Sequence, residues 1–160
     1  MKAMAMLAAA VAAAGFFGLV PFESGDISDF CPVELLCVEQ TRSGVRIRAD
    51  GGITASAENV PTALRELAMT APGRLLLDTV DYLVCVNTLP DAEELLDCGL
   101  RPATSVCCAA VPPEDPQTLA RFLRGHRSLV TLGELEDGKP LEALPTLLPS
   151  GSGWIMEEEA

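Results

Sequence analysis

The sequence predicts an α/β protein with a mixed β-sheet and packed helices in the order β-β-α-β-α-β-α, preceded by an N-terminal hydrophobic helix. Three observations lead to this class. Segments with strand periodicity alternate with segments of helical spacing between residues 33 and 125. Proline stands near the start and glycine near the end of each expected helix. The most apolar strand has hardly any polar face, which is typical of a strand covered on both sides.

Residues 1–22, MKAMAMLAAAVAAAGFFGLVPF, are expected to be a signal peptide or a membrane-anchor helix. After the charge at Lys2, residues 3–20 are unbroken apolar and would make a helix of about 27 Å, enough for the hydrocarbon core of a bilayer. A signal peptide would use residues 3–11 and be cut near Gly15, which would leave an apolar new terminus. We therefore favour an anchor in the cell membrane with the domain on the extracytoplasmic side, and secretion after cleavage is the alternative.

The rest of the chain is expected to divide into a linker, one folded domain and a tail. Residues 23–32 include the acidic stretch ESGDISD and are assigned to an acidic linker. Residues 33–156 hold the alternating segments and are long enough to bury a core as one domain. Residues 157–160 are expected to form a solvated acidic tail.

The first part of the domain predicts a hairpin and a helix. VELLCVEQ (33–40) and VRIRADGG (45–52) have the properties of paired strands, because apolar side chains alternate with arginines in the second. The following apolar residues have helical spacing. That helix is expected to start between Glu58 and Val60 and to end at Pro72, since proline is tolerated only in a first turn.

The second part of the domain repeats strand and helix. RLLLDTVDYLVCVN (74–87) is the strongest strand pattern, and TLPDAEELLDCG (88–99) has the start and stop signals of a short helix. ATSVCCAAV (103–111) predicts the next strand, and EDPQTLARFLRG (114–125) the next helix. After His126 the pattern weakens into short apolar pieces broken by proline and glycine.

The charge balance argues against nucleic acid as a partner. The chain has 23 acidic and 11 basic residues, for a net charge of −12, and its nine arginines are scattered. A phosphate-binding surface needs clustered cations. The acidity is instead typical of a soluble, self-repelling surface.

The cysteines predict no metal or redox centre. Cys107 and Cys108 are neighbours on a strand, so their side chains point to opposite faces and cannot converge on one ion. We expect the four cysteines in predicted strands to be small apolar core residues. A disulfide such as Cys31–Cys98 stays open, because an extracytoplasmic setting permits one. The six cysteines form no C-x-x-C pair: Cys31, Cys37, Cys85, Cys98, Cys107 and Cys108.

No catalytic residue, cofactor or metal site is predicted, and we expect the chain not to be an enzyme. The one histidine, His126, follows a helix end and is expected to face solvent. Asp78 and Asp81 lie three apart on an expected strand and would face opposite ways, which excludes a carboxylate pair. The glycines of residues 49–56 indicate a turn, and PSGSG (149–153) indicates a loop rather than a nucleophile elbow.

Several segments carry a resemblance to a known family: TALRELA, RLLLDTVDYLVCV, EELLDCGLRP and TSVCCAA. In order and residue type they are similar to the N-terminal domain of the Ger(x)C proteins, the C subunits of spore-germination nutrient receptors. The resemblance covers roughly residues 26–156, including DISDFCPVELLCVEQ and KPLEALPTLLPSGSGWI. Thr79 stands where the family tends to have histidine, and the family's lipid-attachment cysteine is missing. Family members continue through further domains, and this chain is expected to correspond to the first.

The resemblance implies a non-enzymatic, membrane-anchored extracytoplasmic subunit or interaction module, similar to a spore-germination receptor component. The implied partners are membrane-protein subunits of such a complex, and the N-terminal helix would contact the membrane. It supplies no catalytic residues. Two alternatives stay open. A solute-binding module would show a deep apolar pocket, and a hydrolase would use Asp78 or Asp81 with a loop serine.

Overall fold

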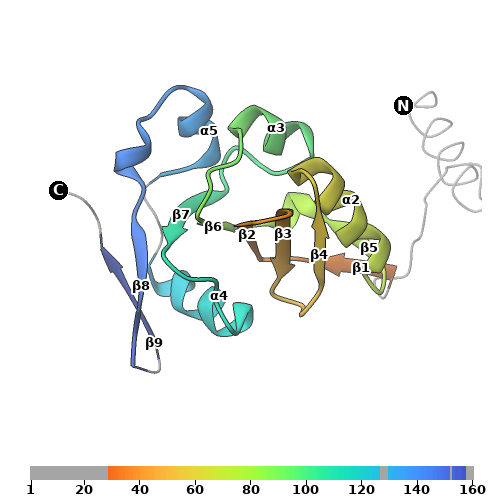
Figure 1. The fold of residues 1–160 in the computed structure, drawn as a ribbon, viewed down its shortest axis with the longest axis horizontal. Helices are drawn as coiled ribbons and strands as arrows, with labels where there is room; N and C mark the ends of the chain where they lie inside the picture. Colours follow the sequence, from red (N-terminus) through yellow and green to blue (C-terminus); the bar gives the residue numbers. More distant parts are fainter. Residues whose placement is uncertain (1–28, 127–129, 152, 158–160) are drawn as a thin grey trace, which may run out of the picture.

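The computed structural model describes residues 29–126, 130–151 and 153–157, and these residues confirm an α/β fold. Within them, a seven-stranded mixed sheet is combined with four α-helices (Figure 1). The predicted N-terminal helix and most of the predicted linker lie outside the described residues. No helix within the described ranges has the length and apolar character needed to cross a membrane.

The main sheet has the strand order β4-β3-β2-β6-β7-β8-β9 among the described residues. β2, β6, β7 and β8 run parallel to one another, whereas β3, β4 and β9 are antiparallel to their neighbours. A separate parallel pair joins β1 (Phe30–Pro32) to β5 (Arg74–Leu76). The strands of the main sheet are β2 (Leu35–Thr41), β3 (Gly44–Ala49), β4 (Thr54–Ala57), β6 (Tyr82–Val86), β7 (Ser105–Ala109), β8 (Thr146–Ser150) and β9 (Gly153–Glu157).

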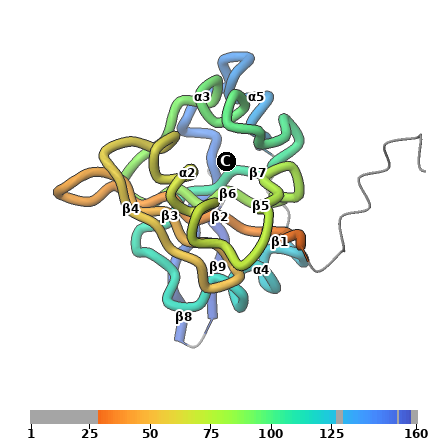
Figure 2. Tube along the Cα trace, turned by 90° about the vertical axis from the view of Figure 1, so that its right-hand side faces the viewer, coloured from red at the N-terminus to blue at the C-terminus, as the bar shows by residue number. Residues whose placement is uncertain are grey.

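Helices cover both faces of this sheet, as Figures 1 and 2 show. α2 (Val60–Thr70), α3 (Ala92–Asp97) and α5 (Leu132–Glu136) lie on one face, and α4 (Pro116–Gly125) lies on the other. Two short 3₁₀ turns, η2 (Leu77–Thr79) and η3 (Leu141–Ala143), complete the described elements.

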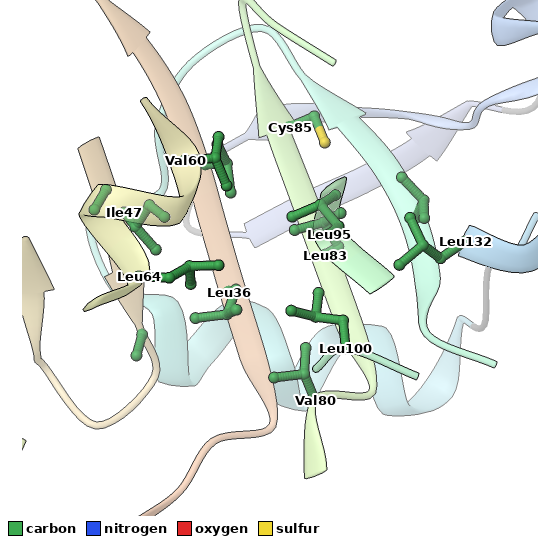
Figure 3. Packing of buried hydrophobic residues seen from close by; sticks show 14 of the residues in the cluster. Leu36, Ile47, Val60, Leu64, Val80, Leu83, Cys85, Leu95, Leu100 and Leu132 are labelled. Atoms are coloured by element: carbon green, nitrogen blue, oxygen red, sulfur yellow. The ribbon is translucent and has the colours of Figure 1, made fainter. Parts of the chain in front are cut away.

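The core lies on the two faces of the central strands. β6 is buried along its whole length because β2 and β7 flank it and helices cover it, as its apolar sequence predicts. Leu36, Ile47 and Leu83 project from the strands toward Leu64 of α2 and Leu95 of α3 (Figure 3). Most of this core comes from segments that the sequence predicted. They are the hairpin and the four strand and helix segments between residues 74 and 125.

Local sequence explains where the longer helices start. Asn59 accepts a hydrogen bond from the backbone N–H of Thr62 at 3.0 Å and begins α2 within the predicted range. Asp115 does the same for Gln117 at 3.0 Å and begins α4 immediately before Pro116.

The prediction of one continuous strand over residues 74–87 is wrong. The segment forms β5, then the turn η2, then β6, and β5 belongs to the smaller sheet. The Thr79 hydroxyl stabilises the break: it accepts from the backbone N–H of Val33 at 3.0 Å and lies 2.7 Å from the carbonyl oxygen of Leu76. Thr79 therefore joins the segment before β2 to the turn before β6.

Several elements were not predicted. β1 occupies the end of the expected linker, and β4 follows the turn at Gly51 and Gly52 that was predicted within residues 49–56. The weak region after His126 contains α5, β8 and β9. Within PSGSG (149–153), expected to be a loop, Pro149 and Ser150 end β8 and Gly153 begins β9, and Gly151 has a φ of +57°. Glu157, assigned to the tail, is the last residue of β9.

Candidate functional site

The adjacent cysteines lie where strand geometry predicts, on opposite faces of β7. Cys107 is buried in the cluster on the α4 side, and Cys108 packs against the cluster on the other side. Burial raises the pKa of Cys37 to about 12 and also raises the pKa of Cys85 and of Cys107. Burial therefore favours the protonated form of these thiols, which pack as small apolar residues in the core.

All six cysteines lie within the described residues, and each is a free thiol. The Cys31–Cys98 bridge that the sequence left open is not formed. Burial raises the pKa of the Cys98 thiol, and the nearby carboxylates of Glu94 and Asp97 add to the shift. The described residues contain no group of three or more His, Cys, Asp or Glu placed to hold a metal ion.

His126 lies exposed at the C-terminal end of α4, as predicted. Its Nδ1 is 3.1 Å from the carbonyl oxygen of Phe122, and the two rings stack with centroids 4.3 Å apart. The imidazole therefore has a structural role in closing the helix.

Asp78 and Asp81 do not lie on one strand, so the reason given for excluding them as a pair is wrong. Asp78 belongs to η2, and Asp81 precedes β6. Asp81 accepts a hydrogen bond from Arg101 at 2.6 Å, and both side chains are about half exposed. Asp81 and Ser105 line one recess of about 230 Å³, but within the described residues no hydrogen bond joins their side chains. This arrangement positions an ion pair rather than an activated serine.

The largest recess described here, about 620 Å³, is an open groove between the β7–α4 loop and the tip of the β8–β9 hairpin. Val111 and Trp154 supply apolar surface, and Glu114 and Asp115 supply carboxylates. Asp115 is already engaged as the cap of α4. The groove is therefore a surface feature and not the deep apolar pocket that a solute-binding module needs.

A second surface combines one exposed and two half-buried leucines with several carboxylates around α3 and α5. One groove of about 420 Å³ is lined on its apolar side by Leu89, Leu135 and Leu141, and Leu141 is 54% exposed. A second recess of about 390 Å³ adjoins it, since Asp91 and Glu93 line both. We call the two together the acidic α3 surface. Its carboxylates are Asp91, Glu93, Glu94, Asp97 and Glu136.

Helix stability explains part of this charge but not all of it. Asp91 caps α3 by accepting from the backbone N–H of Glu93 at 3.0 Å, and acidic residues in a first turn favour the helix dipole. Asp97 and Glu136 stand in the last turns of α3 and α5, where the dipole disfavours negative charge. No lysine or arginine is among the described residues that line the two recesses. The surface therefore concentrates negative charge beyond what folding requires.

The sequence predicted α3 and its acidic start, but it did not predict this surface. Leu135 and Leu141 come from the region after His126, where no element was assigned. Leu135 belongs to α5, which contacts α3, and Leu141 belongs to η3 and lines the same groove. The one sequence signal for this surface was the set of short apolar pieces after His126, because apolar side chains usually pack against other parts of a fold.

Comparison of the chain with protein-family models, curated proteins and solved structures found no match.

Proposed function

We propose that the chain is a non-enzymatic interaction module, held at the cell membrane on the extracytoplasmic side. The observation that carries the proposal is the acidic α3 surface, where exposed Leu141 shares a groove with Asp91, Glu93 and Glu136 and the adjoining recess adds Glu94 and Asp97. An apolar groove rimmed by one sign of charge is the anatomy of a protein-binding site, because apolar contact supplies affinity and charge supplies specificity.

The partner is a membrane-protein subunit that presents an apolar segment bearing lysine or arginine. Its cations would lie against the carboxylates of α3, and its apolar side chains would cover Leu89 and Leu141. The resemblance to the Ger(x)C N-terminal domain supports a germination-receptor-like complex as the assembly. Salt is expected to weaken the association, since the charges lie on an exposed surface.

The anchor is the apolar segment over residues 3–20, proposed to form a single N-terminal helix in the membrane. Its length and the charge at Lys2 support an orientation with the domain outside the cell. Protease added to intact cells should then remove the domain while leaving a cytoplasmic control protein intact. Protection of the domain from that protease would contradict the assignment.

Site-specific photo-crosslinking from the native membrane tests the interaction. A photoreactive residue at Leu141 should give a crosslinked product with an integral membrane protein. The same residue at Met69, 71% exposed near the end of α2, should give none. Equal yields from both positions, or products with soluble proteins only, would contradict the proposal.

Two charge-reversed double variants distinguish the effect of this surface on crosslinking from the effect of the overall net charge. Glu93→Lys with Asp97→Lys should abolish the product from Leu141. Glu58→Lys with Glu66→Lys, an equal change at exposed positions around α2, should leave it unchanged.

A further inference from the structure

β9 forms an open edge of the main sheet. It pairs with β8, and within the described residues no strand pairs with its other side (Figure 1). β9 contains neither proline nor lysine, the residues that usually protect an edge, and Ile155 is 50% exposed. The hairpin is held to the sheet by two pairs, Cys108 with Thr146 and Ala109 with Leu147. Its tip therefore extends beyond the neighbouring strands, as both Figure 1 and Figure 2 show.

The register identifies the backbone groups that this edge offers. Ser150 pairs with Gly153 across the tip, and the closing pair of a two-residue hairpin exchanges backbone hydrogen bonds. Such bonds recur at every second residue, so the N–H and C=O groups of Ile155 point toward β8. Those of Trp154 and Met156 point outward, away from the sheet.

We propose that β9 pairs antiparallel with β9 of a second copy of this chain, with Ile155 of each copy facing the other at the centre. In this register Trp154 lies opposite Met156 of the second copy. All the outward N–H and C=O groups of these two residues are then hydrogen-bonded between copies. A shift by two residues would place Trp154 or Met156 opposite a residue outside β9.

The side chains fit the same register. Ile155 faces Ile155 in a pair without backbone hydrogen bonds, where side chains approach most closely, so the exposed apolar surface is covered. Glu157 lies opposite Gly153, so the two carboxylates are at opposite ends of the paired strands. The strands are self-complementary, which is what a twofold interface requires.

The interface is small, and each copy carries a net charge of −12. We therefore expect a reversible dimer that added salt strengthens by screening repulsion. This is the opposite of the salt dependence expected at the acidic α3 surface. The pairing uses residues on a different part of the fold and does not depend on that surface.

The test is disulfide formation from the full-length chain under mild oxidation. Ile155→Cys should give a covalent dimer on non-reducing gels, because the two introduced thiols face each other. The wild-type chain, whose thiols are buried or half-buried, should give no covalent dimer under the same treatment. Ile155→Lys should lower the fraction of dimer captured by a crosslinker that does not react with amines, because it places two like charges opposite each other at the centre of the pair.

A mixing experiment fixes the direction of the pairing. Gly153→Cys and Glu157→Cys chains should form disulfide dimers when co-expressed but not when expressed separately. The change at Gly153 is tolerated, because a Cβ there meets its nearest neighbour, the Ser150 carbonyl oxygen, at 3.9 Å. Dimers from each variant by itself would indicate a parallel pair and overturn the proposal. Absence of dimers from Ile155→Cys, or disulfides from it to another protein instead, would also overturn it.

Discussion

The two faces of the main sheet are covered in different ways. On one face α2, α3 and α5 enclose a cluster of twenty buried residues of the described chain. On the other face α4 is the one described helix, and the cluster beneath it contains eleven buried residues, including Leu119, Leu123 and Cys107. The first face is therefore stabilised by a larger buried apolar area than the second.

Polar contacts at both ends of α4 compensate for the smaller cluster. Before the helix, Arg48 donates to the carbonyl oxygen of Pro113 at 3.3 Å. At its other end, Arg124 donates from Nε to a carboxylate oxygen of Glu34 at 2.6 Å, and a second bond from the same guanidinium completes the pair. A helix that covers its face without helical neighbours is thus fixed at its ends as well as along its apolar side.

Truncation of one leucine on each face gives the largest contrast. Leu83→Ala, on the three-helix face, should lower the free energy of unfolding by about 3–5 kcal/mol, because the surrounding helices cannot close the cavity. Leu123→Ala, beneath α4, should cost about 2–3 kcal/mol, since one helix can shift to fill the space. Denaturant unfolding of both variants measures the difference. An equal or larger loss for Leu123→Ala would show that the α4 face is at least as rigid as the three-helix face.

The buried thiols report which face opens first. Cys37 and Cys107 lie beneath α4, whereas Cys85 lies on the three-helix face, and burial raises the pKa of all three. If α4 separates locally from the sheet, a thiol reagent should modify Cys37 and Cys107 before Cys85 under native conditions.

The same leucine variant sharpens this comparison. Leu123→Ala should accelerate modification of Cys37 and Cys107 by about tenfold or more, because each 1.4 kcal/mol of local destabilisation is tenfold in the opening equilibrium. It should leave Cys85 nearly unchanged. Mass spectrometry of modified peptides over time provides the readout, and simultaneous modification of all three cysteines would indicate global unfolding instead.

Local periodicity predicted the centre of this fold. The apolar run that became β6, the alternation of β3 and the start signals of α2 and α4 depend on residues close in sequence. The opposite directions of Cys107 and Cys108 followed from the two-residue period of a strand. These features needed no knowledge of distant contacts.

The features that were missed depend on distant contacts. The break after β5 is stabilised by a hydrogen bond between Thr79 and Val33, 46 residues apart. β1 and β5 have three residues each and become strands through pairing with one another. The acidic α3 surface brings Asp91 together with Leu141, which lies in the region after His126 where no element was predicted. Composition and periodicity do not indicate which distant segments come into contact.

The smallest predicted effect is the pH dependence of the contact that closes α4. The hydrogen bond from Arg124 lowers the pKa of Glu34 below its ordinary value of 4.5. A carboxyl group with a lowered pKa in the folded state stabilises the fold above its unfolded pKa, and this stabilisation is lost as pH falls through the folded pKa. The half-buried carboxyl of Asp50, which accepts from the backbone N–H of Glu34 at 3.2 Å, has a raised pKa and the opposite pH dependence.

Arg124→Gln isolates the contribution of the pair. The wild-type chain should be more stable than this variant near neutral pH, and the difference should shrink as the pH falls below 4.5 and Glu34 takes up its proton. The contribution of Asp50 is present in both chains and largely cancels. Because both partners are partly exposed, added salt should reduce the difference. Arg42→Gln in the β2–β3 turn is the matched control and should show no such pH dependence. If wild type and Arg124→Gln differ by the same free energy of unfolding at pH 7 and at pH 3, α4 is stabilised by packing and not by this ion pair.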